Sequence, residues 1–115
     1  MGSAMSIAAS GMQAAVLRLD AAASNIVNND SDAYRPVSVS QSPSADGGIR
    51  ASLRPATPLL AFDPGAPYAM QGSEPHMDLP TELVNLKLAE HGFRANLLAY
   101  KASSEMFKTL LDATA

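Results

Sequence analysis

The two ends of this chain carry long stretches in which apolar residues recur at alternating spacings of three and four, a heptad pattern that predicts striped helices. The first stripe combines large residues with a column of alanines: Met5, Ala8, Met12, Ala15, Leu19, Ala22 and Ile26. The second, interrupted by Glu90 and Ser104, consists of Leu79, Leu83, Leu86, Phe93, Leu97, Tyr100, Phe107 and Leu111. Two such helices suit a protein that packs against copies of itself or against neighbours.

We expect the first helix from about residue 3 to about residue 28, where turn-forming residues follow. The second is expected from about residue 78 to about residue 113, with Asp78 as its N-cap and Pro80 in its first turn. Only Arg18 and Asp20 are charged in the first helix, so we expect it to be contacted on more than one side. Gly11 and Gly92 either permit close helix contact or are simply tolerated.

Oppositely charged residues four positions apart are expected to form ion pairs on the outer surface of the second helix, each contributing a few tenths of a kcal/mol. The pairs are Glu90–Arg94, Lys101–Glu105 and Lys108–Asp112.

The middle of the chain has a different character, because all eight prolines lie between Pro36 and Pro80. Apolar and polar residues alternate over 37–39 and over 49–54, which predicts two short strands joined by a turn at 46–48. The prolines that follow favour an extended, irregular strap. The fold class is therefore mainly α: two long terminal helices forming an antiparallel coiled-coil pair, joined by a short β-hairpin and a proline-rich irregular strap. We divide this single domain into residues 1–30, 31–77 and 78–115.

Composition excludes several classes of function. A net charge of −3 argues against a nucleic-acid partner, and the absence of cysteine excludes disulfides and thiolate metal sites. No apolar run reaches the roughly 18 residues of a membrane span, so we expect no membrane insertion. The first helix also lacks the basic segment of a cleavable signal, which predicts a cytoplasmic protein or export by a route that reads no such signal.

Residues able to do chemistry are few. His76 and His91 are the only histidines and have no nearby metal-ligand pattern. Asp78 and Glu82 share a helical face, but acids at a helix start ordinarily complement its dipole. We therefore expect no enzyme activity, no catalytic residue, no cofactor and no metal.

Both ends carry more specific motifs. Residues 10–15 read SGMQAA and are followed by Arg18-Leu19-Asp20 and by ASNIVN at 23–28. The second helix carries ELVNL at 82–86, FRANL at 93–97 and EMFKTLL at 105–111. This ordered pair of terminal motifs resembles the bacterial flagellar rod and hook proteins. Tyr34-Arg35-Pro36 and FDPGAP at 62–67 are similar to segments of the proximal-rod, FlgC-type members.

The resemblance implies a structural subunit of the flagellar basal-body rod in the periplasm. Such subunits are exported unfolded by the flagellar type III export apparatus, and their terminal helices pair with each other and with other rod subunits in a helical tube. The tube transmits torque to the hook and conducts later subunits. A helical-hairpin adaptor or export chaperone is the alternative interpretation, and it would bury its heptads within a monomer or dimer.

In a rod subunit the residues of interest are interface residues. The expected assembly interface comprises Met5, Met12, Ala15, Leu19, Ile26, Leu83, Leu86, Phe93, Leu97, Tyr100, Phe107 and Leu111.

Overall fold

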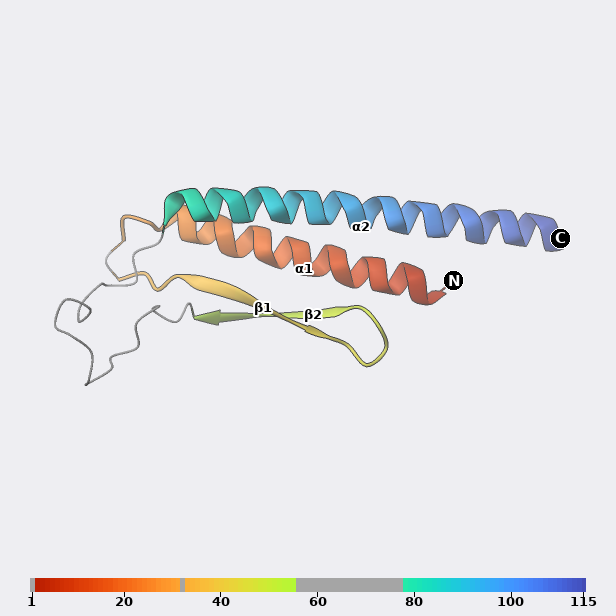
Figure 1. Cartoon of the computed structure of the whole chain (residues 1–115), viewed down its shortest axis with the longest axis horizontal. Coiled ribbons are helices and arrows are strands. Elements are labelled where there is room, and N and C mark those ends of the chain that lie inside the picture. Colours follow the sequence, from red (N-terminus) through yellow and green to blue (C-terminus); the bar gives the residue numbers. More distant parts are fainter. Residues whose placement is uncertain (1, 32, 56–77) are drawn as a thin grey trace.

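The structure is a computed structural model that describes residues 2–31, 33–55 and 78–115. Its elements are α1 (Gly2–Val27), β1 (Val37–Pro43), β2 (Ile49–Pro55) and α2 (Leu79–Thr114), as Figure 1 shows. The mainly helical fold, with two terminal helices and a two-stranded antiparallel sheet, is confirmed. The proline-rich strap expected at 56–77, with its FDPGAP segment and His76, lies outside the described residues.

Helix α1 lies in the middle of the molecule, with α2 on one side and the β-hairpin on the other (Figure 1). The two helices run in opposite directions, and α2 continues beyond the start of α1 at its C-terminal end (Figure 1). Helix α2 extends past α1 because it is longer, with 36 residues against 26. The expectation that α1 is contacted on more than one side is confirmed.

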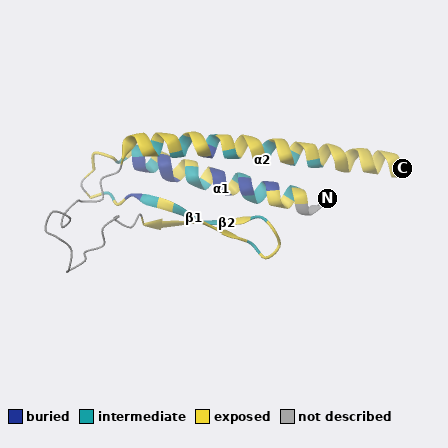
Figure 2. Ribbon diagram, viewed as in Figure 1, coloured by how far each residue is buried: buried dark blue, intermediate teal, exposed yellow. Residues whose placement is uncertain are grey.

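Small side chains make up the core. Apart from Pro36, the buried apolar side chains of the described residues are all alanines, five on α1 and one, Ala89, on α2 (Figure 2). Because Ala8, Ala15 and Ala22 are seven residues apart, they share the face of α1 that meets α2. Ala14 and Ala21, also seven apart, lie on the side of the hairpin. Helix α1 therefore buries two alanine columns, one for each neighbour.

The heptad stripe of α2 coincides only in part with the face that meets α1. The buried position is Ala89, just before the stripe position Glu90, and Leu83 is 52% exposed. Glu82, Ala89, Asn96 and Ser103 are buried or half-buried and lie seven residues apart, so the contact follows a heptad column one position before that of Leu83, Glu90 and Leu97. Large apolar side chains of α2 therefore flank the contact with α1 or point away from it.

The hairpin pairs Val37 with Pro55 and Pro43 with Ile49. The Val37 N–H and C=O form hydrogen bonds with Asn25 of α1, so they point away from β2. Because hydrogen-bonded and non-hydrogen-bonded pairs alternate in an antiparallel sheet, Pro43 and Pro55 also occupy non-hydrogen-bonded positions. Neither proline removes a hydrogen bond between the strands. The predicted turn is confirmed, with Gly47 and Gly48 at φ of +78° and +97°, where a side chain would be strained.

Helix α2 begins after Asp78, which is its N-cap residue, with Pro80 in the first turn. The Asp78 carboxylate accepts a hydrogen bond from the Thr81 hydroxyl and does not cap a backbone N–H.

Of the three predicted i,i+4 ion pairs on α2, only Glu90–Arg94 forms, at 2.7 Å. The expectations for Lys101–Glu105 and Lys108–Asp112 are wrong: within residues 78–115 the ion pairs are Glu90–Arg94 and Lys87–Glu90. Both failed pairs place the base before the acid, which is the less favourable orientation on a helix.

Candidate interaction surfaces

The buried amide of Asn25 attaches the base of the hairpin to α1. Its Nδ2 donates to the Val37 carbonyl at 2.8 Å, and its Oδ1 accepts from the Val37 N–H at 2.9 Å. The amide thus takes the place of a neighbouring strand at this edge of the sheet. The Tyr34 hydroxyl also donates to Oδ1 at 3.0 Å and lies 3.0 Å from the Ser24 hydroxyl. At 2% exposure, Asn25 is the buried polar residue of the described core, and both polar atoms of its amide have hydrogen-bond partners.

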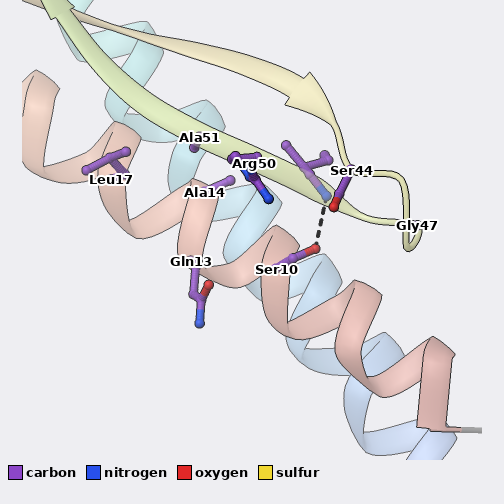
Figure 3. A pocket seen from close by; sticks show the side chains of 9 residues that line it. Ser10, Gln13, Ala14, Leu17, Ser44, Gly47, Arg50 and Ala51 are labelled. Carbon is purple, nitrogen blue, oxygen red and sulfur yellow. Dashed lines mark hydrogen bonds between the residues drawn. The ribbon is translucent and has the colours of Figure 1, made fainter.

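Ser10 attaches the other end of the hairpin. Its hydroxyl donates to the Ile7 carbonyl at 2.7 Å and accepts from the Ile49 N–H at 3.1 Å. Figure 3 shows Ser10 on α1 beneath the end of the hairpin. A hollow of about 350 Å³ lies between α1 and the hairpin, lined by Ser10, Gln13 and Leu17 and by the strand residues Arg50 and Ala51. Hydrogen bonds therefore hold the hairpin to α1 at both of its ends.

A second hollow, of about 330 Å³, lies between α1 and α2. We call it the helix groove; its lining is Ala15, Val16, Leu19, Ala89, Glu90, Phe93 and Arg94. Val16 and Leu19 are 44% and 37% exposed, so their apolar side chains are only partly covered.

The charged rim of the helix groove centres on Glu90. Its carboxylate lies 3.3 Å from Lys87 Nζ and 2.7 Å from Arg94 Nη2. The hydrogen bond from Lys87, together with the charges of Lys87 and Arg94, holds the pKa of Glu90 below its ordinary value. The groove therefore presents apolar side chains beside a carboxylate that stays ionised at neutral pH.

Exposed apolar side chains also continue along α2 beyond the start of α1. We call residues 104–114 the α2 extension; Met106, Phe107, Leu110 and Leu111 there are 43% to 56% exposed. Their spacing places them on one face, whereas Lys101, Glu105, Lys108 and Asp112 form a charged stripe on the opposite face. The α2 extension is thus an amphipathic helix end with its apolar face uncovered in the single chain.

The expected interface residues fall into three groups. Ala15 is buried. Half-buried are Met5, Met12, Ile26, Leu86, Leu97 and Tyr100. Exposed are Leu19, Leu83, Phe93, Phe107 and Leu111. The structure brings Ala15, Leu19 and Phe93 together in the helix groove, places Phe107 and Leu111 on the α2 extension, and leaves Leu83 near the opposite end of α2.

Sequence reasoning missed the roles of Asn25, Ser10 and Asn96, although all three lie in the terminal motifs. A usable signal was the asparagine at position 25, which lies inside an apolar helix although asparagine is a poor helix former. The sequence also did not show whether Gly11 and Gly92 permit close helix contact or are simply tolerated. The structure separates them: a Cβ at Gly11 would lie 2.3 Å from Asn96 Oδ1, whereas one at Gly92 would meet nothing within 4 Å.

The described residues contain no group of three or more side chains able to hold a metal ion. His91 is exposed on α2. Within the same residues, neither helix is long and apolar enough to cross a membrane. A scan of protein-family models finds no match to this chain, and a search of curated proteins finds no match either.

Proposed function

We propose that the chain is a structural subunit of the flagellar basal-body rod. In this proposal its terminal helices pack as coiled coils with each other and with neighbouring subunits, in the wall of a periplasmic tube that transmits torque. Its partners are other rod subunits, further copies of itself and the flagellar type III export apparatus. It has no catalytic site, and its functional residues are interface residues.

The observation that carries the proposal is the uncovered apolar face of the α2 extension. Leu110 and Leu111 are 51% and 53% exposed, and Phe107 is 43% exposed. Burying such side chains contributes about 1.5–3 kcal/mol each, so an uncovered row of them favours association. A helix end that projects beyond its own partner is suited to the next subunit of a continuous wall.

The composition of the core supports the same proposal. A contact made by Ala8, Ala15, Ala22 and Ala89 buries little apolar area per residue. The larger side chains, which could contribute most, lie on the flanks of that contact. An export chaperone built as a helical hairpin would instead be expected to place its largest apolar side chains between its own helices.

The flagellar part of the proposal rests on the terminal motifs. Four of their residues make specific contacts: Gly11 lies against Asn96, and Ser10 and Asn25 bond to the hairpin. The motifs therefore include residues that hold the elements of the fold together, as well as apolar residues available to neighbours.

The test is an exchange of single residues in a flagellated bacterium that carries this gene. Leu110→Asp would bury an unpaired carboxylate in the assembled wall, at a cost of several kcal/mol. We expect the variant to be made at normal levels, to be missing from purified basal bodies and to abolish swimming.

Lys108→Asp is the matched control, because it introduces the same side chain on the charged stripe of the same helix end. This variant should enter basal bodies and support swimming. Normal incorporation of the Leu110 variant would refute the proposal. Loss of secretion of another flagellar protein, with intact incorporation of rod subunits, would instead support the chaperone interpretation.

A further inference from the structure

We propose that Asn96 and Gly11 form a lock that fixes the axial register of α2 against α1. Gly11 is buried on the face of α1 that meets α2, and the Asn96 side chain occupies the space where a Cβ would be. A Cβ at position 11 would lie 2.3 Å from Oδ1, 2.6 Å from Cγ and 2.8 Å from Nδ2 of Asn96. These separations are far below van der Waals contact, so the missing side chain makes the fit possible.

The amide of Asn96 is held in place. Its Nδ2 donates to the Gly92 carbonyl, one turn earlier on α2, at 2.7 Å. Moving the side chain out of the contact breaks this hydrogen bond. Asn96 therefore acts as a fixed projection from α2 that fits a gap on α1.

The alanine column of α1 does not distinguish one register from the next. Because Ala8, Ala15 and Ala22 are seven residues apart, a slide of one heptad would again place alanine against α2. The same slide would bring Asn96 opposite Ala4 or Arg18 in place of Gly11. Gly11 is the position on this face that distinguishes one register from the next.

No other described element corrects a slip. The hairpin contacts α1, and among the described elements α2 contacts α1 alone. A slip of one heptad moves α2 by about 10 Å, at 1.5 Å per residue, and changes the length of the α2 extension accordingly. The lock thus determines how far α2 projects beyond α1. This inference concerns one chain and holds whether or not the chain is a rod subunit.

Electron-spin distance measurement on the full chain tests the lock. The natural chain has no cysteine, so labels at Asp20→Cys and Ala102→Cys, both exposed, report the position of α2 along α1. Excess unlabelled chain keeps each measured pair within one molecule. With Gly11 and Asn96 intact, we expect one narrow distribution of distances between the two labels. A broad distribution in this chain would overturn the proposal.

Gly11→Ala should lower the share of the native distance and populate others displaced by about 10 Å, the length of a heptad. Asn96→Ala should broaden the distribution while helicity by circular dichroism is retained. In the double variant alanine meets alanine, so the native distance should reappear among others. Gly92→Ala is the matched control and should keep the narrow native distance, since nothing lies within 4 Å of its Cβ.

Two results would contradict the lock. The native distance alone, in both Gly11→Ala and Asn96→Ala, would mean that register is set elsewhere. Failure of the double variant to recover any native distance would mean that position 11 does not act through Asn96.

Discussion

The two helices carry similar heptad patterns, yet their surroundings are opposite. Helix α1 is contacted on two sides, and its alanine columns and Asn25 are buried (Figure 2). Helix α2 contacts only α1 among the described elements, and much of its large apolar surface is exposed. In this chain the fully buried contacts are made mainly by small residues, whereas the large apolar residues are half-buried or exposed. The size of the side chains in a heptad therefore carries information that the spacing alone does not.

The largest loss of stability is expected when α1 loses the residue that attaches the hairpin. Asn25→Ala leaves the N–H and C=O of Val37 without their partner, and each unsatisfied buried group costs about 1–3 kcal/mol. We expect the free energy of unfolding to fall by about 2–4 kcal/mol in urea titrations. Amide exchange at Val37 should accelerate as well. Asn29→Ala, at an exposed position, is the control and should be nearly neutral. Equal stability of the two variants would remove the hairpin from our account of α1.

A smaller effect is expected from enlarging the alanine column. Ala15→Leu adds volume to a closely packed contact, and overpacking costs about 1–3 kcal/mol although leucine is the more apolar residue. Ala23→Leu places the same side chain at an exposed position of α1 and should change stability little. Thermal unfolding of both variants measures the difference. If Ala15→Leu is as stable as the natural chain, the helix groove accommodates leucine, and close packing at position 15 does not restrict the size of the side chain.

The smallest effect on stability is expected at the charged rim of the helix groove. Because its pKa is lowered in the folded chain, Glu90 contributes stability that is present above its ordinary pKa of 4.5 and is lost as the pH falls through the lower, folded value. Glu90→Gln should therefore flatten the decline of stability in acid. Because the pair is exposed, added salt should reduce the difference. Glu105→Gln, at a position without an ion pair in residues 78–115, serves as control. Identical acid profiles for the two variants would show that the rim contributes nothing measurable.

The sequence predicted the elements because each has a local cause. Heptad spacing specified both helices within about a residue of their ends, and alternation around Gly47-Gly48 specified the hairpin. The buried faces were harder to predict. Leu83, an expected interface residue, is 52% exposed, whereas the buried position of α2 is Ala89, which no large apolar side chain marks in the sequence. Whether Gly11 or Gly92 makes a close contact depends on a side chain 85 positions from Gly11 in sequence, and no local pattern reports that.

The central claim is that the outward apolar side chains of α2 are covered by neighbouring subunits. Its most direct test is the reactivity of a single thiol, because the natural chain has no cysteine of its own. With Leu110→Cys, we predict rapid maleimide labelling of the isolated chain and blocked labelling in intact basal bodies, restored when the basal bodies are dissolved. Equal labelling of the isolated chain and of the basal bodies would contradict the account. So would absence of the Leu110→Cys variant from basal bodies of cells in which it is the only copy of this chain.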